Sequence, residues 1–306
     1  MSLNRTPLAA FTCDDDDGQH IYLYYQAPNG DIKEAIFDEA SNWAPNPQNT
    51  STVGTAKLNT GLAVISWDVG QQVRVYYLGQ ESKIVERCNN GQGGWDDGEL
   101  TGKYQAAPYS KIAAVNLSKT GANIHVYYQD STNKLRETIS IGDWPEGTTR
   151  LPVAVVGTSI AASINFDPNR SGQIWLYYQD TDLTLKEKWY SGSNDNWSTG
   201  SFKATNVFPP GASLSAALWG FQNDRVASVD ENNQLCVTPC SGPWNSTVNI
   251  GQVTITLSDV VLISVGGGSE PASALRMFFQ EAGGAITHFA SSDGDTWSLV
   301  TQNILG

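Results

Sequence analysis

The chain has 306 residues, of which 40% are hydrophobic and only 16% are charged, so it is long enough to bury a substantial core. Its formal net charge is −13, with 18 basic against 31 acidic residues. This balance argues against a nucleic-acid partner, because a phosphate backbone requires a basic surface. No apolar run reaches the roughly 18 residues that cross a membrane as a helix, so we expect no membrane partner.

Six similar units follow one another along the chain, each built around an aromatic strand. This strand reads IYLYYQ from residue 21, VRVYYL from 73, IHVYYQ from 124 and IWLYYQ from 174, and two divergent copies, RVASV and LRMFFQ, begin at 225 and 275. A strand of small apolar residues precedes each copy and a third strand follows it. Each unit closes on a tryptophan: Trp43, Trp95, Trp144, Trp197, Trp244 and Trp297.

The residue pattern within each unit indicates antiparallel strands. Apolar residues alternate with period two, the turns are rich in Gly, Asn and Asp, and helical periodicity is absent. Four strands per unit and six units predict an all-β, six-bladed β-propeller. We expect one domain over residues 1–306, and two packed β-sandwiches are the alternative. The expected blades are roughly 8–58, 59–108, 109–157, 158–210, 211–258 and 259–306.

The second unit combines Arg74 in its aromatic strand with Glu86, twelve residues later, in its third strand. We expect the two to be opposed on adjacent strands and to share one face of the sheet. The equivalent pairs in the other units are Tyr22/Glu34, His125/Glu137, Trp175/Glu187, Arg225/Val237 and Arg276/His288. Only the second unit therefore keeps both an arginine and a glutamate.

The pattern I-R-V-Y-Y-Q, followed by I-x-E and a closing tryptophan, resembles the fungal fucose-binding lectins of the Aleuria aurantia type over essentially the whole chain. The resemblance implies a sugar bound between blades, where an arginine and a glutamate hydrogen-bond it and a tryptophan of the next blade stacks on it. By position, these ligand-binding residues are Arg74, Glu86 and Trp144. Alternatively, Arg74 and Glu86 form a structural ion pair inherited from an ancestral lectin.

The five clefts that lack the pair suggest a second function. Proteins similar to this lectin family act as hetero-Diels–Alderases in fungal tropolone-sesquiterpenoid biosynthesis, where they join a quinone methide to a humulene-type terpene. A cycloaddition needs orientation and a hydrogen-bond donor, but no nucleophile, metal or cofactor. We therefore hypothesise a cofactor-free hetero-Diels–Alderase that binds an apolar polyketide or terpene. The candidate catalytic residues are Tyr22, His125, Trp175, Arg225 and Arg276.

The alternative to this enzyme is a fucose-binding lectin with one intact site, whose partner is a fucosylated glycan. The sequence leaves open whether the protein forms a homodimer. The N-terminal segment lacks the apolar stretch of a signal peptide, from which we expect a cytoplasmic protein.

The sequence indicates neither a metal site nor a disulfide framework. Its three histidines are too scattered for a metal cluster, and the run Asp14–Asp17 lacks the spaced ligands of a calcium loop. The four cysteines have no zinc-ligand spacing. We expect free thiols, with a bridge between Cys236 and Cys240 as the alternative.

Overall fold

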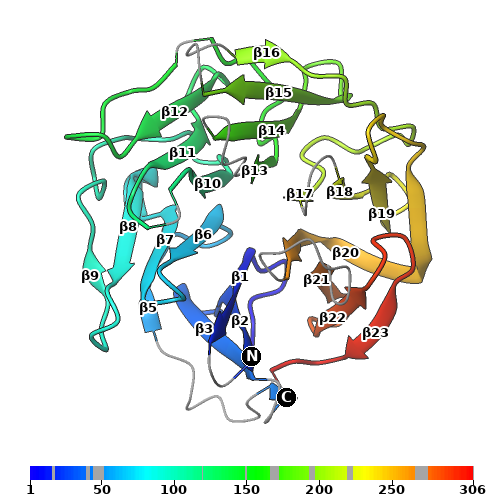
Figure 1. Cartoon of the computed structure of the whole chain (residues 1–306), viewed down its shortest axis with the longest axis horizontal. Helices are drawn as coiled ribbons and strands as arrows, with labels where there is room; N and C mark the ends of the chain where they lie inside the picture. Colours follow the sequence, from blue (N-terminus) through cyan, green and yellow to red (C-terminus); the bar gives the residue numbers. More distant parts are fainter. Residues whose placement is uncertain are drawn as a thin grey trace.

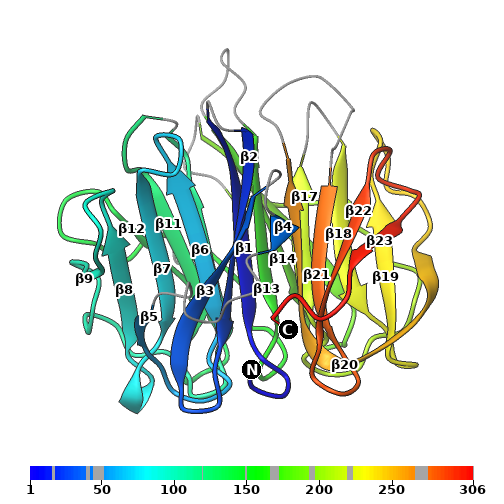
Figure 2. The same cartoon turned by 90° about the horizontal axis from the view of Figure 1, so that it is seen from below.

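The computed structural model describes residues 1–15, 18–38, 42–43, 52–118, 120–148, 150–165, 172–192, 197–218, 223–265 and 275–305. Six blades surround a central axis (Figure 1), and their strands run from one face of the ring to the other (Figure 2). The six-bladed propeller predicted from the repeats is thus confirmed, and the sandwich alternative is wrong. Asp16 and Asp17 of the acidic run lie outside the described residues.

The strands of each blade follow one another outward from the axis as an antiparallel meander. Blade 1 contains β1 (Leu8–Asp15), β2 (Gly18–Gln26), β3 (Asp31–Asp38) and β4 (Asn42–Trp43), with β5 (Thr52–Thr55) also paired to β3. Blade 2 contains β6 (Leu62–Trp67), β7 (Gln72–Leu78), β8 (Ile84–Asn89) and β9 (Asp96–Asp97), with a 3-10 turn, η2 (Gln80–Ser82), between β7 and β8. Blade 3 contains β10 (Ile112–Asn116), β11 (Ile124–Gln129) and β12 (Leu135–Ile139).

Blade 4 contains β13 (Ile160–Asn165), β14 (Gln173–Gln179), β15 (Leu185–Ser191) and β16 (Trp197–Thr199). Blades 5 and 6 contain β17 (Leu214–Leu218), β18 (Asp224–Val229), β19 (Gln234–Pro239), β20 (Val248–Ser264), β21 (Leu275–Glu281), β22 (Ile286–Ser291) and β23 (Ser298–Thr301). These two blades form one continuous sheet, because the long strand β20 is the outer strand of blade 5 and then the inner strand of blade 6.

The same strand register recurs in all six blades. In each blade one residue of the inner strand, called here the first register residue, is paired with the last aromatic position of the repeat or with its divergent equivalent. It is the first residue of the strand in blades 1 to 5, and Val260 within β20 in blade 6. These pairs are Leu8/Tyr25, Leu62/Tyr77, Ile112/Tyr128, Ile160/Tyr178, Leu214/Ser228 and Val260/Phe279. Because side chains alternate across a strand, an identical register turns the same repeat positions toward the neighbouring blade each time.

The hydrophobic core lies between blades. One cluster, for example, joins Tyr76 and Leu78 of blade 2 to Ile112 and Ile124 of blade 3. The ring is closed between blades 6 and 1 by Gln280, whose Oε1 accepts the Thr6 N–H at 3.2 Å and whose Nε2 donates to the Leu3 carbonyl at 2.9 Å.

All four cysteines are free thiols, so the bridge between Cys236 and Cys240 does not form. The part of the chain that the structure describes contains no helix long and apolar enough to cross a membrane.

Candidate functional site

Arg74 and Glu86 lie on neighbouring strands of blade 2, but they are not directly opposed. Arg74 is paired with Cys88, and Glu86 is paired with Tyr76. The two side chains therefore share one face of the sheet as diagonal neighbours. The expectation that they are directly opposed is wrong, because the residue opposite Arg74 is two positions beyond Glu86.

Glu86 is 3% exposed and is oriented by two donors of its own blade. The Tyr76 hydroxyl donates to Oε1 at 2.9 Å, and the Leu100 N–H donates to Oε2 at 3.1 Å. Burial raises the pKa of the Glu86 carboxyl, and these two hydrogen bonds act in the opposite direction. Each carboxylate oxygen keeps a lone pair with which it could accept a ligand hydroxyl.

Gly98 is the residue that makes room for this carboxylate. A Cβ at this position would overlap the Glu86 side chain, and the Gly98 N–H donates to the Glu86 carbonyl at 2.9 Å. Gly147 and Gly200 stand in the same way against Glu137 and Glu187. Each of these three buried glutamates therefore requires a glycine, outside the third strand, against its side chain.

Arg74 is held by one end of its guanidinium. Nη1 donates to the carbonyls of Val73 at 2.9 Å and Asn89 at 3.3 Å, and the Trp67 ring lies under the guanidinium carbon at 4.8 Å. Nη2 makes a 3.3 Å contact with Gln72, and Nε makes no hydrogen bond to any described residue. The edge formed by Nε and Nη2 is thus almost unused.

The structure forms no ion pair between Arg74 and Glu86, although both residues are described. Arg74 lowers the pKa of Glu86 only as a lesser effect behind burial and the two hydrogen bonds. The interpretation of the two residues as a structural ion pair is therefore wrong. Donor and acceptor lie on one face without neutralising each other by direct contact.

Trp144 of the next blade packs against the tyrosine that orients Glu86. Its side chain is 4% exposed and lies edge-on to Tyr76, with the ring centroids 6.4 Å apart. Tyr104 donates to the Trp144 carbonyl at 2.6 Å and fixes the backbone. The indole N–H makes no hydrogen bond within the described part of the chain. Trp144 thus packs against Tyr76 in the apolar cluster between blades 2 and 3, and its ring is not a free-standing platform.

In blades 3 and 5 the groups at the equivalent positions are bonded to other protein groups. Nδ1 of His125 lies 2.9 Å from Glu137 Oε1, so donor and acceptor are bonded to each other. Arg225 is 3% exposed; its Nε donates to the Gly294 carbonyl at 3.1 Å and its Nη2 to Asp295 at 3.1 Å. In Arg225 both Nε and Nη2 are therefore bonded to protein groups, whereas in Arg74 they are nearly unused.

The remaining candidates are packed against their own or the neighbouring blade. Tyr22 stacks on Phe11 with ring centroids 4.7 Å apart, and burial raises its pKa to about 12. Trp175 packs against the apolar cluster between blades 4 and 5. Arg276 lies near His288, whose pKa is lowered to about 3, chiefly by burial and then by the Arg276 charge.

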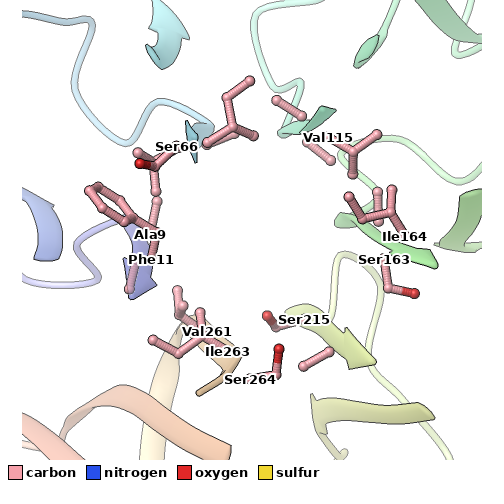
Figure 3. Close-up of a pocket in the computed structure, with 18 of the residues that line it drawn as sticks. Ala9, Phe11, Ser66, Val115, Ser163, Ile164, Ser215, Val261, Ile263 and Ser264 are labelled. Atoms are coloured by element: carbon pink, nitrogen blue, oxygen red, sulfur yellow. The ribbon is translucent and has the colours of Figure 1, made fainter. Parts of the chain in front are cut away.

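A cavity of about 880 Å³ lies on the axis, lined by the six inner strands (Figure 3). Its described walls are mostly small or aliphatic residues such as Ala9, Val115 and Val261, with hydroxyls from Ser163 and Ser215. The five candidate catalytic residues do not line this cavity, and they lie in five different blades. They therefore cannot act together on one substrate.

Sequence reasoning missed Tyr76 and Gly98. The signal for the tyrosine was present, because a tyrosine precedes the glutamate by ten residues in each of the first four units: Tyr24/Glu34, Tyr76/Glu86, Tyr127/Glu137 and Tyr177/Glu187. The glycines gave no comparable signal, since their distance from the glutamate varies between units.

The sequence matches the family described as fungal fucose-specific lectin over residues 2–304. The chain belongs to the fungal fucose-specific lectin family. It is 31% identical to a fucose-specific lectin of Aspergillus fumigatus over 99% of this chain and 95% of that one, and 29% identical to the fucose-specific lectin of Aleuria aurantia over 97% and 95%. The crystal structure of the Aleuria aurantia lectin, a six-bladed β-propeller, superposes with a TM-score of 0.87 at 27% identity, covering 100% of this chain and 97% of that one.

The family membership overturns the enzyme hypothesis. The relatives from Aspergillus fumigatus and Aleuria aurantia are fucose-specific lectins, and the superposed Aleuria aurantia structure is that of a lectin, not of a cycloaddition catalyst. The positions of the five candidate catalytic residues also argue against the enzyme. Tyr22, His125, Trp175, Arg225 and Arg276 do not converge on a pocket, and those with described partners are bonded or stacked within the protein.

Proposed function

We propose that this protein is a lectin that binds a fucose-type sugar in the cleft between blades 2 and 3, through Arg74, Glu86 and Trp144. The observation that supports this most directly is the contrast between two arginines at equivalent positions. Both anchor Nη1 on the carbonyls one residue before and fifteen residues after, but only Arg74 leaves its Nε and Nη2 edge nearly free. A charged donor edge without a strong protein partner is available to a ligand.

The chemistry of the cleft suits a pyranose ring. Arg74 offers donors and Glu86 offers acceptor lone pairs on the same face, and each sugar hydroxyl can both donate and accept. By analogy with the family, Trp144 would supply the apolar contact, and its ring is supported edge-on by the buried Tyr76. Relatives of this chain are fucose-specific lectins, and an Aleuria aurantia lectin variant of 27% identity has been solved with α-methyl-L-fucoside. We infer the same sugar class here.

A single cleft implies modest apparent affinity on glycan surfaces. Multivalent lectins gain apparent affinity by engaging several weak sites at once, and one site per chain forfeits that gain. The partner of this protein is therefore a fucosylated glycan bound one residue at a time.

Titration calorimetry with α-methyl-L-fucoside tests the proposal. We expect one site per chain, abolished by Arg74→Ala. Lys103→Ala serves as a charge-matched control in the same blade, because Lys103 pairs with the exposed Asp143 and should leave binding unchanged. Binding that survives Arg74→Ala, or three or more sites per chain, contradicts the assignment.

A further inference from the structure

Lys111 and Asp259 meet on the axis of the ring, 148 residues apart in sequence. Nζ of Lys111 lies 2.9 Å from Oδ1 and 3.0 Å from Oδ2 of Asp259, so the ammonium bridges both carboxylate oxygens. Lys111 precedes the inner strand of blade 3, and Asp259 lies next to Val260 in the inner strand of blade 6. These blades face each other across the ring (Figure 1).

Both residues occupy the same position of the repeat, directly before the first register residue of an inner strand. The six equivalents are Pro7, Gly61, Lys111, Ser159, Ser213 and Asp259. The two charged members stand three blades apart, which is the only spacing in a six-membered ring that places two residues on opposite sides of the axis.

The pair lies at one end of the axial cavity. A small cavity of about 40 Å³ is lined by Lys111, Asp259 and the first register residue of all six inner strands. Five of those six residues also line the large axial cavity, so the small cavity adjoins the large one. The ion pair therefore lies where all six blades converge.

The surroundings of the pair are arranged to hold it. A Cβ at Gly61 would lie 2.7 Å from the Lys111 Cα and 2.6 Å from the Ile112 nitrogen, so only glycine allows the Lys111 backbone this position. On the other side, the Val260 N–H donates to the Ser213 hydroxyl at 2.8 Å and fixes the strand that bears Asp259. The Leu214 N–H donates to Ser159 at 3.0 Å in the same way.

We propose that Lys111 and Asp259 form an axial clamp, an ion pair that closes this mouth of the cavity and couples blades 3 and 6. With this pair, contacts at the same end of the inner strands link blade 4 to blade 5 through Ser159, blade 5 to blade 6 through Ser213, and blade 6 to blade 3 through Asp259. The side chains of Lys111 and Asp259 are only 28% and 17% exposed. Removal of one charge therefore leaves the other partly buried without its partner, which costs more than the loss of an exposed pair.

A double-mutant cycle tests the clamp. We expect Lys111→Met and Asp259→Asn each to lower the melting temperature by about 3–6 °C, and the double variant to lose clearly less than the sum of both. Lys103→Met is the matched control, since it breaks an ion pair whose acid is 95% exposed, and it should shift the melting temperature by less than about 1 °C.

Hydrogen exchange of Asp259→Asn tests whether the destabilisation is localised at the axis. This measurement does not require Lys111→Met to fold. In Asp259→Asn, which preserves side-chain volume, we expect the Val260 amide to exchange about tenfold faster, with no change in the outer strands. Strictly additive single variants, shifts equal to that of the control, or an unchanged Val260 amide each overturn the proposal. The outcome is independent of sugar binding.

Discussion

Tyr76 donates a 2.9 Å hydrogen bond to Glu86 from the directly opposed position on the neighbouring strand. The same relationship joins Tyr24 to Glu34 at 2.5 Å and Tyr127 to Glu137 at 2.9 Å. The repeated tyrosine therefore orients a carboxylate in each of these blades, and this carboxylate is buried in blades 2 and 3. In blade 2 alone, that carboxylate shares its face with an arginine whose outer edge is nearly free.

Tyr76→Phe should weaken fucoside binding and shift its pH dependence. The Tyr76 hydrogen bond lowers a Glu86 pKa that burial raises, so its loss raises this pKa further. A ligand that needs the carboxylate loses affinity as the pH falls through the folded-state pKa, and this loss should begin at a higher pH in the variant. Because one hydrogen bond to a charged group is removed, we expect about 5–20-fold weaker binding near pH 5. Dissociation constants measured from pH 4 to 8 check this, and parallel profiles for both proteins contradict it.

Gly98→Ala should strongly weaken sugar binding without unfolding the protein. The added methyl group would overlap the Glu86 carboxylate and force it to rotate away from the cleft. We expect at least a tenfold loss of fucoside affinity by titration calorimetry. Gly200→Ala is the matched control, because it presses on Glu187 in the same way in blade 4. Equal affinities of the two variants would show that Glu86 does not contact the sugar.

Asp224→Asn should reduce the pH dependence of stability. Asp224 is 5% exposed and accepts hydrogen bonds from Tyr177 at 3.0 Å and Ser163 at 3.2 Å, and burial raises its pKa to about 7. Between the ordinary aspartate pKa and pH 7, the folded state keeps a proton that the unfolded state has released. The raised Asp224 pKa therefore stabilises the folded state at low pH relative to high pH. The free energy of unfolding falls as the pH rises to about 7, by up to about 1.4 kcal/mol per pH unit.

Urea unfolding of wild type and Asp224→Asn at pH 5 and pH 8 measures this effect. We expect the wild type to lose more stability than the variant between these values. The nearby Glu187 carboxyl, whose pKa burial also raises, titrates in the same sense in both proteins, so the variant should keep part of the pH dependence. Identical pH slopes would contradict the raised Asp224 pKa.

His288→Phe should stabilise the protein. Both ring nitrogens of His288 are buried without a hydrogen-bond partner, and its ring stacks on Phe278 with centroids 4.7 Å apart. Phenylalanine keeps the stack and removes the unsatisfied groups, for an expected gain of about 1–2 kcal/mol at pH 8. The gain should be larger at pH 5, because the lowered His288 pKa makes the wild type lose stability as the pH falls below about 6.5. A destabilised variant at both pH values would indicate that the site cannot accommodate the larger ring.

Much of this architecture follows from the sequence alone. The recurrence of one strand pattern from Tyr25 to Phe279 predicts six blades, because each repeat can bury its apolar faces only against a neighbouring copy. The twelve-residue spacing identifies Arg74 and Glu86 as the one retained pair, and the hairpin places them on the same face. Both inferences depend only on local periodicity, which a strand obeys wherever it lies.

Only the tertiary structure decided which of these side chains are free to bind. Arg74 and Arg225 are equivalent in the repeat, yet Arg225 is consumed by Gly294 and Asp295, some seventy residues away in the next blade. The partners of Lys111 and Tyr177 likewise come from other blades. Spacing within a unit determines which residues share a strand face, but contacts between blades depend on how the sheets pack around the axis. For that reason the sequence predicted the position of the candidate site, while the packing of the ring determined that Arg74 keeps a nearly free donor edge.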